Sequence, residues 1–175
     1  MDLERSAFIL HQPAMPYIID GHNLIPKLPG HQLSDLDDEQ KLVELLQEFC
    51  RRERKQAEVY FDNAPPGSPR TQSFGAVMAR FVRQGSTADD AIQARLVRLG
   101  KSARNWTVIS SDGQVQAAAR QARAHYLSAE AFAAKLTEIA RQGEPESGRE
   151  APPGLSEAEL QEWLDLFGRS RGKKG

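Results

Sequence analysis

The sequence predicts an α/β protein in which a central parallel sheet lies between two layers of helices. Short apolar runs of strand length alternate along the chain with longer amphipathic segments of helix length. Because parallel strands need long crossover connections, this alternation favours a doubly wound sheet with helices on both faces. The chain has 175 residues, of which 39% are hydrophobic and 27% charged, and this suits one compact domain with modest tails.

The first predicted strand is the apolar run 17–19, which ends abruptly in Asp20-Gly21-His22-Asn23. A loop rich in Pro and Gly follows, and an acidic cluster at 35–38 leads into a helix from about Glu39 to Lys55. The apolar residues of this helix fall on one face at helical spacing, and they are Leu42, Leu45, Leu46, Phe49 and Cys50. Cys50 is therefore expected in the core, and not as a nucleophile.

The second strand is expected over 57–61 and ends in Asp62, after which a turn-rich loop occupies 63–71. A third strand is expected over 75–82. The segment Ser86-Thr87-Ala88-Asp89-Asp90 then starts a helix that runs to about Ser102. A fourth strand over 106–109 closes in Ser110-Ser111-Asp112-Gly113. A helix over about 114–124, a short strand at 125–127 and a helix from Ala129 to Arg141 complete the pattern.

Composition divides the chain into five segments. An N-terminal arm occupies 1–15 and the main domain 16–141, and a polar linker rich in Pro, Gly and Glu occupies 142–154. A short amphipathic helix is expected over 155–168, with Leu160, Trp163, Leu164 and Phe167 on one side, and a basic tail over 169–175. This helix is expected either to dock on the domain or to bind a partner. Oligomeric state does not follow from the sequence.

The formal net charge of -1 argues against a protein that binds nucleic acid through bulk charge alone. The charges are unevenly distributed, because residues 1–48 hold nine acids and three bases, whereas residues 80–125 hold eight bases and three acids. No run of about 18 apolar residues exists, so no membrane span is expected. The N-terminus does not resemble a signal peptide, and the single cysteine excludes an internal disulfide. A cytoplasmic protein is expected.

Acidic residues follow the predicted strands repeatedly. Asp20 follows the first strand, Asp62 the second and Asp112 the fourth, while Asp89 and Asp90 start the helix after the third. In an open parallel sheet, ligands bind at the carboxyl ends of the strands. Carboxylates that converge there repel one another unless a cation neutralises them, and oxygen ligands suit Mg²⁺ or Mn²⁺. Such an ion can activate water for attack on a phosphodiester, alone or as one of a pair.

Each acid also has a local explanation. Asp112 or Ser111 can cap the helix that follows, and Thr87 with Asp90, or Ser86 with Asp89, fits a capping box. Asp62 can open the turn after its strand. Taken singly, these local roles are favoured for Asp62 and Asp90 and are about even for Asp89 and Asp112. Asp20 is harder to explain locally, and Asn23 three residues on can orient it or donate to a phosphate.

Four blocks of the sequence resemble the NYN domains, a branch of the PIN-like nucleases. The blocks are Ile18-Ile19-Asp20-Gly21-His22-Asn23-Leu24-Ile25, Val59-Tyr60-Phe61-Asp62, Ser86-Thr87-Ala88-Asp89-Asp90-Ala91-Ile92 and Val108-Ile109-Ser110-Ser111-Asp112. They occur in the family's order over residues 17 to about 140, and within the family they look most like the YacP-like group, which includes a ribosome-associated mRNA endonuclease.

The resemblance implies a PIN-like three-layer α/β/α fold and a Mg²⁺ or Mn²⁺ site formed by Asp20, Asp89 and Asp112. Asn23, Asp62, Asp90 and Ser111 would support that site. The family usually has an aromatic residue where this chain has His22. His22 is a candidate general base or metal ligand, although an exposed loop histidine is the favoured interpretation.

The resemblance also implies an endoribonuclease, with RNA as its partner and ribosome-bound mRNA as the expected form of that RNA. Composition does not distinguish RNA from DNA. Arg70, Arg80 and Arg83 are candidates for binding the phosphate backbone, because a phosphate suits a forked donor, although surface solvation explains them equally well. The main alternative is an RNA- or ribosome-binding module with a nuclease fold and little turnover. A phosphatase of another α/β type is disfavoured, because it would normally have an acid at position 22.

Overall fold

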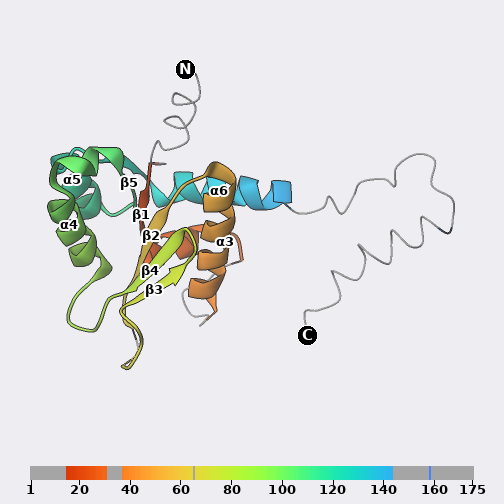
Figure 1. The fold of residues 1–175 in the computed structure, drawn as a ribbon, viewed down its shortest axis with the longest axis horizontal. Helices are drawn as coiled ribbons and strands as arrows, with labels where there is room; N and C mark the ends of the chain where they lie inside the picture. Colours follow the sequence, from red (N-terminus) through yellow and green to blue (C-terminus); the bar gives the residue numbers. More distant parts are fainter. Residues whose placement is uncertain (1–14, 31–36, 65, 144–157, 159–175) are drawn as a thin grey trace, which may run out of the picture. The chain divides into compact units, whose positions relative to one another are not determined.

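The computed structural model describes residues 15–30, 37–64, 66–143 and 158 (Figure 1). The chain divides into two units, 1–139 and 140–175, and of the second unit only 140–143 and 158 are described. The predicted amphipathic helix at 155–168, the linker beyond Gly143 and the basic tail therefore lie outside the described residues, apart from Ala158.

The centre of the fold is a six-stranded sheet with the strand order β3-β4-β2-β1-β5-β6. All neighbouring strands are parallel except β3 and β4, which are antiparallel. The strands are β1 (Tyr17–Asp20), β2 (Ala57–Phe61), β3 (Thr71–Phe74), β4 (Val77–Phe81), β5 (Thr107–Ile109) and β6 (His125–Leu127). The chain builds one half of the sheet outward from β1 through β2 and then returns to build the other half through β5. The central strand β1 is thus the point at which the order reverses.

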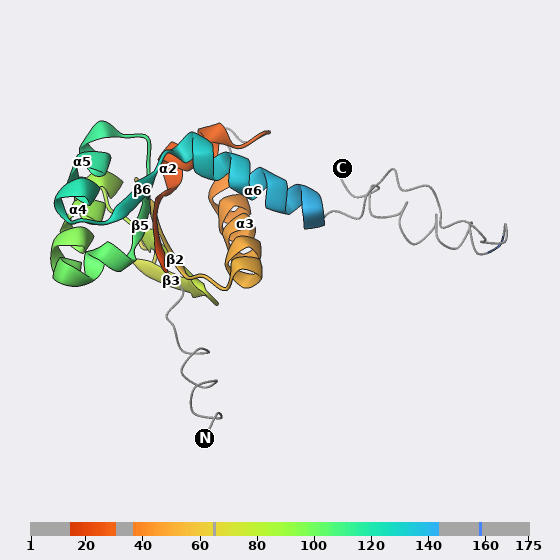
Figure 2. The same ribbon diagram turned by 90° about the horizontal axis from the view of Figure 1, so that it is seen from above.

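Helices cover both faces of the sheet (Figure 2). The longer helices are α3 (Asp38–Glu53), α4 (Ala88–Leu99), α5 (Gly113–Gln121) and α6 (Ala129–Gly143). Successive residues of a strand point to opposite faces. Ile19 accordingly packs with α3 and α6, and Ile18 packs with α4 and α5. The predicted three-layer α/β/α architecture is confirmed.

An aromatic cluster joins β1 to the helices α3 and α6. The ring centroid of Tyr17 lies 5.3 Å from that of Phe49 and 5.5 Å from that of Phe132, and the last two are 5.2 Å apart. Edge-to-face and tilted contacts at these separations add to the burial of the rings. Cys50 lies in the same core, as predicted, and burial raises the pKa of its thiol to about 11. A thiol with such a pKa is not a nucleophile at neutral pH.

Three parts of the chain differ from the sequence prediction. The strand predicted over 75–82 is the second arm of a hairpin, and β3 lies inside and just beyond the predicted loop 63–71. The β3 residues Thr-Gln-Ser-Phe are mostly exposed, so they lack the apolar alternation by which a strand is predicted. The helix predicted to end near Ser102 ends at Leu99, and Gly100, at φ +52°, begins the short 3₁₀ segment η2 (Gly100–Asn105).

The third difference follows Asp20 directly. One turn of helix, α2 (Gly21–Leu24), runs into the 3₁₀ turn η1 (Ile25–Lys27) where a loop was expected. A turn of four residues is too short to show helical periodicity. Within the described ranges, no helix combines the length and apolar character needed to cross a bilayer.

Candidate active site at the carboxyl edge of the sheet

Asp20 is the last residue of β1, in the middle of the sheet. The carboxyl ends of β2 and β5 flank it on either side, and they continue into Asp62 and into Ser110-Ser111-Asp112. Asp20 is only 5% exposed, although it is an acid. It lies at the point where the strand order reverses, which is where open α/β sheets bind their ligands.

Gly21 allows the chain to turn immediately after Asp20. A Cβ atom at this position would lie 2.4 Å from Cε1 of Phe61 and 2.9 Å from the carbonyl oxygen of Tyr60. Both neighbours are fixed, since Phe61 is fully buried and the oxygen belongs to the backbone of β2. Glycine is therefore required here for the close approach of α2 to β2.

The carboxyl group of Asp89, in the first turn of α4, interacts with that of Asp20. Burial raises the pKa of Asp20 to about 7, and the negative charge of Asp89 adds to the effect. The backbone N–H of Asn23 partly offsets it. Because two neighbouring carboxylates repel each other, protonation of Asp20 is favoured up to about neutral pH.

The other acids at the strand ends also raise the pKa values of Asp20 and Asp89. Burial raises the pKa of Asp89, and the charge of Asp112 is the next cause, with smaller contributions from Asp62 and Asp90. Asp62 also contributes to the raised pKa of Asp20. Asp20, Asp62, Asp89 and Asp112 therefore form one cluster, which we call the acid cluster. Asp90 is exposed at its margin.

Two of these acids also cap helices; the cap by Asp112 was suggested by its local sequence, whereas Asp62 was expected only to open the turn after its strand. Oδ1 of Asp112 accepts hydrogen bonds from the backbone N–H groups of Gln114 and Val115, at 2.8 and 3.1 Å. Oδ1 of Asp62 accepts from the N–H of Ala88 at the start of α4. Capping and membership of the cluster are compatible, because each cap uses only one of the two carboxylate oxygens.

Thr87 provides the remaining cap of α4. Its hydroxyl accepts a hydrogen bond from the N–H of Asp90 at 3.1 Å. Of the two capping arrangements that the sequence left open, the one with Thr87 and Asp90 is present.

Asn23, Ser110 and Ser111 hold the loop after β5 against Asp20. Oδ1 of Asn23 accepts a hydrogen bond from the N–H of Ser111 at 2.8 Å. The Ser110 hydroxyl donates to Oδ2 of Asp20 at 3.4 Å and accepts from the N–H of Asp112 at 3.1 Å. Ser110 was not predicted as a site residue. Its only signal in the sequence is a polar residue that follows directly after a buried strand.

A second group of polar contacts borders the cluster on the β6 side. The Ser111 hydroxyl accepts from the N–H of Ala129 at 2.9 Å and donates to the carboxylate of Glu130. Lys27 pairs with Glu130 at 2.9 Å between Nζ and Oε1. The bond from Ser111, together with Lys27, lowers the pKa of Glu130 to about 2. Neither Lys27 nor Glu130 has a distinctive position in the sequence, because only the tertiary fold brings them together.

His22 is not an exposed loop histidine, which corrects the interpretation favoured from the sequence. It belongs to α2, its side chain is 25% exposed, and its ring packs on Phe61 with centroids 5.6 Å apart. Nε2–H donates to Oε1 of Glu39 at 2.8 Å, and Nδ1 accepts from the N–H of Asp62 at 3.3 Å. The bond to Glu39 raises the pKa of His22 above its usual value.

The three candidate arginines are in different environments. Arg70 and Arg83 are exposed. Arg80 is half-buried: its Nε lies 3.4 Å from Oε2 of Glu58 and its guanidinium 6.0 Å from the ring centroid of Tyr60. Arg83 lines a hollow of about 340 Å³ between the loops that follow β2 and β4, at the same edge of the sheet as Asp62.

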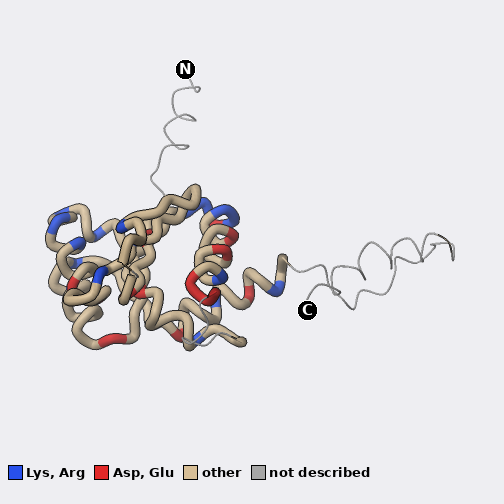
Figure 3. The backbone as a smooth tube through the Cα atoms, turned by 90° about the horizontal axis from the view of Figure 1, so that it is seen from below, with Lys and Arg blue, Asp and Glu red and all other residues tan. Residues whose placement is uncertain are grey.

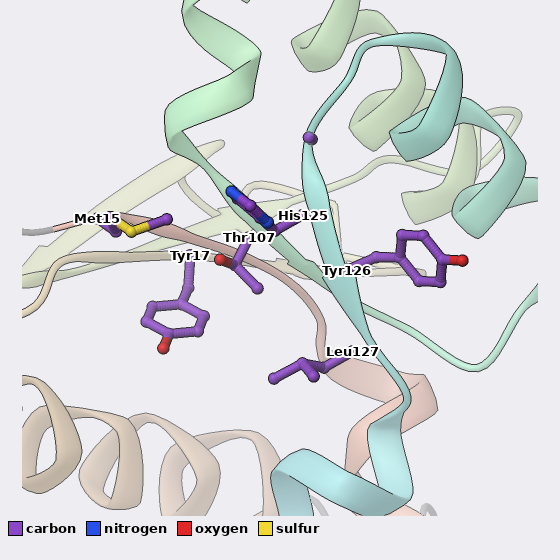
Figure 4. A pocket seen from close by; sticks show the side chains of 7 residues that line it. Met15, Tyr17, Thr107, His125, Tyr126 and Leu127 are labelled. Atoms are coloured by element: carbon purple, nitrogen blue, oxygen red, sulfur yellow. The ribbon is translucent and has the colours of Figure 1, made fainter.

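A hollow of about 470 Å³ lies apart from the acid cluster (Figure 4). It lies at the β6 side of the sheet, where Tyr17, Thr107 and His125 are neighbours in register at the start of their strands. Leu127 and Met15 also line it, and Figure 4 shows that Tyr126 points away from Tyr17. No carboxylate lines this hollow.

The acid cluster suits a hard divalent cation in its chemistry. All its donors are oxygens, and its repulsion is of the kind that a cation relieves. The side-chain arrangement is less complete, because no three Asp, Glu, His or Cys residues of the described segments are placed to hold one ion together. The pKa of Asp20 is raised, so metal binding near neutral pH would have to displace its proton and bring in Asp112.

Two crystal structures of Rae1 (YacP) from Bacillus subtilis have similar folds. One gives a TM-score of 0.61 with 19% sequence identity, over 89% of this chain and 84% of that chain. The other, of the W164L mutant, gives 0.57 with 24% identity, over 73% and 77%. At these identities the likeness establishes the fold. None of the curated proteins matches this chain.

The family comparison is more specific than the likeness of folds. The pattern of the YacP-like NYN domain matches residues 17–165, which is most of the sequence. The match includes every residue of the acid cluster, and membership implies a nuclease. This chain belongs to the YacP-like NYN domain family.

Proposed function

We propose that this protein is a divalent-metal-dependent endoribonuclease that hydrolyses RNA phosphodiester bonds at the acid cluster. The observation that supports it best is the convergence of Asp20, Asp62, Asp89 and Asp112 at the carboxyl edge of the sheet, where they share one electrostatic field. Such repulsion has a cost in a folded protein and is typical of a site that binds a cation.

In this proposal Asp20, Asp89 and Asp112 hold Mg²⁺ or Mn²⁺. When bound, the ion would supply a nucleophilic water and neutralise charge on the phosphodiester. Ser110 and Asn23 orient the ligands, since the first donates to Asp20 and the second fixes the backbone at Ser111. Asp62 holds the start of α4, and so positions Asp89. Asp90 and Ser111 support the margin of the cluster.

Arg70 and Arg83, which are exposed, would contact the phosphates of the substrate strand on the β4 side. Arg80 would attract the substrate mainly through its positive charge and not through a direct contact with phosphate, because it already pairs with Glu58. We further propose that the substrate is RNA, in the form of mRNA presented on the ribosome, and that the protein acts in the cytoplasm. The net charge of -1 supports a presented substrate over one captured by long-range attraction.

The test compares single carboxylate-to-amide variants in cleavage of a labelled RNA with Mn²⁺. We expect Asp20→Asn and Asp89→Asn to lower the rate at least about a hundredfold, because each removes a charged ligand. Glu44→Gln is the control, since Glu44 is an exposed residue of α3 remote from the cluster. Wild-type rates in both aspartate variants would refute the assignment.

The alternative is an RNA-binding module with a nuclease fold and little turnover. Among the residues that the structure describes, no three ligand side chains are placed to hold one ion, and this favours the module over a metal-dependent nuclease. Calorimetric titration with Mn²⁺ discriminates the two. A nuclease should bind the ion and release about half a proton at neutral pH, because the pKa of Asp20 is about 7, whereas a module without a metal site should show neither heat nor proton release.

A further inference from the structure

The surface at the amino edge of the sheet, opposite the carboxyl edge that carries the acid cluster, is strongly basic. Residues 91–129 contain six bases and one acid, Asp112, which belongs to the acid cluster. One of the bases, Arg95, is engaged internally, with Nη2 2.7 Å from Oε1 of Glu58. The other five are exposed, and they are Arg98, Lys101, Arg104, Arg120 and Arg123. We call these five residues the basic surface.

The fold gathers these bases because two helices end at the same place. Helices α4 and α5 both start at the carboxyl edge and run back to the amino edge of the sheet, where Arg98 and Arg120 occupy their last turns. Arg104 precedes β5 by three residues, and Arg123 precedes β6 by two. The carbonyl of Trp106 accepts a hydrogen bond from the N–H of His125 at 2.9 Å. This bond holds the segments that lead into β5 and β6 side by side.

Figure 3 shows several Lys and Arg segments on the α4–α5 side, whereas α3 carries both acidic and basic segments. Cations at helix C-termini are favoured by the helix dipole, and this explains one base at each end. It does not explain five exposed bases without an acid nearby. Within the described residues, Arg98, Lys101, Arg104 and Arg123 pair with no carboxylate.

An exposed aromatic ring lies on the same surface. Tyr126 is 39% exposed, and the guanidinium of Arg120 lies 5.9 Å from its ring centroid. Four of the five bases are arginines, whose planar forks match phosphate oxygens better than an ammonium does. Arginines around an exposed ring are typical of surfaces that bind a phosphate backbone and stack an unpaired base.

We propose that the basic surface is an RNA-anchoring site that binds the phosphate backbone of a structured RNA and is separate from the acid cluster. The two sites lie at opposite edges of the sheet, roughly 10 Å or more apart for strands of three to four residues. The anchoring site goes beyond the proposed nuclease function and does not depend on cleavage. It also reconciles a net charge of -1 with an RNA partner, because the bases are concentrated on one surface.

The test measures binding of a fluorescent RNA hairpin in the presence of a chelator, so that cleavage does not occur. The variant combines Lys101→Gln, Arg104→Gln and Arg123→Asn, the last because Arg123 has φ +60° and asparagine tolerates that conformation. The control combines Arg51→Gln, Lys55→Gln and Arg54→Asn, where Arg54 has φ +52° at the end of α3. Both proteins lose three positive charges, so bulk charge is matched.

We expect the basic-surface variant to bind the hairpin at least about tenfold more weakly than the control near 0.1 M salt. Its slope of log affinity against log salt should be shallower by about 2 to 3, since roughly 0.7 to 0.9 is lost per phosphate contact. Equal affinities of variant and control would overturn the proposal. Competition by poly-L-glutamate as effective as by RNA, at equal charge, would also overturn it and assign the surface to acidic proteins.

Cleavage of a short single strand separates this proposal from the nuclease assignment. The basic-surface variant should retain the wild-type kcat on a strand too short to reach the amino edge. If the wild-type protein cleaves no RNA, but the basic-surface variant binds the hairpin more weakly than the control does, the nuclease assignment fails and the anchoring site stands. If cleavage is normal and hairpin affinity is unchanged, the anchoring site alone fails.

Discussion

At the scale of single residues, Asp20 shows how one position can be both costly and useful. A carboxyl group that is 5% exposed beside a second acid destabilises the fold when both are ionised. The fold tolerates this because Gly21 lets the chain turn away at once and Ser110 donates to the carboxylate. The motif Asp-Gly-x-Asn is therefore a structural unit: the acid faces the site, the glycine fits against β2, and the asparagine fixes the neighbouring loop.

Gly21→Ala should destabilise the protein by about 1 to 3 kcal/mol or more, because its methyl group would overlap the buried ring of Phe61 and the backbone of β2. Gly113→Ala is the matched control. Gly113 begins α5 and has open space around its Cβ position, so alanine should be neutral or stabilising by up to about 1 kcal/mol. Urea unfolding of the two variants measures the difference, and equal stabilities would contradict the packing argument.

The site residues were predictable to different degrees. Asp20, Asp89 and Asp112 follow strands or start helices, so chain order alone places them at one edge of a parallel sheet. Ser110, Lys27 and Glu130 were not predictable, because their roles depend on contacts between segments far apart in sequence. For the same reason the sequence could not show that His22 lies between two acids.

At the scale of secondary-structure elements, a chain of contacts links α3 to α4 through the acid cluster. Glu39 in the first turn of α3 accepts from His22, His22 accepts from the N–H of Asp62, and Asp62 caps α4 two positions before Asp90. Asp89 lies in that capped turn. His22 therefore positions the cluster indirectly, through the orientation of Asp62.

His22→Phe should lower the RNA cleavage rate by about three- to tenfold and should also lower Tm by several degrees. The phenyl ring keeps the packing on Phe61 but loses both hydrogen bonds, each worth about 0.5 to 1.5 kcal/mol. Glu39→Gln should retain most of the activity, since its amide oxygen can still accept from Nε2–H, whereas Glu39→Ala should behave like His22→Phe. A wild-type rate in His22→Phe would show that the link has no role in positioning.

The two elements that were not predicted from the sequence, β3 and α2, both lack a regular apolar pattern. β3 is exposed and polar, so it pairs with β4 through its backbone without an apolar signal in its side chains. α2 is a single turn whose geometry is imposed by the packing of Gly21 on Phe61. The long amphipathic helices and the buried strands were predictable because each buries one regular face, and their order was enough to predict the layers.

At the scale of the whole molecule, the acid cluster should make stability depend on pH when no cation is present. The pKa of Asp20 is raised from 3.8 to about 7. Below about pH 4 both the folded and the unfolded chain are protonated at this group, so the full stability is present. Between about pH 4 and pH 7 the unfolded chain ionises first, and stability falls as the pH rises through the pKa of the folded state.

The free energy of unfolding should fall by an amount on the order of 2 to 4 kcal/mol, since each pKa unit corresponds to 1.36 kcal/mol. This fall should be absent in Asp20→Asn. The measurement is urea unfolding of both proteins in chelator at about pH 4.5 and pH 7.5. The difference between wild type and variant isolates Asp20 from His22, whose raised pKa also favours the folded state at low pH. A difference that does not change with pH would contradict the raised pKa.

A divalent cation should reverse this dependence, because a bound ion replaces the proton on Asp20 and removes the repulsion from Asp89 and Asp112. At about pH 7.5, Mn²⁺ at roughly one hundred times its Kd should stabilise the wild-type protein by about 2.7 kcal/mol. Asp20→Asn and Asp89→Asn should gain little, whereas Glu44→Gln should gain as much as wild type. The four Tm values, with and without Mn²⁺, decide between a metal centre and a cluster that only binds protons: an equal gain in all four proteins would place the ion elsewhere on the molecule.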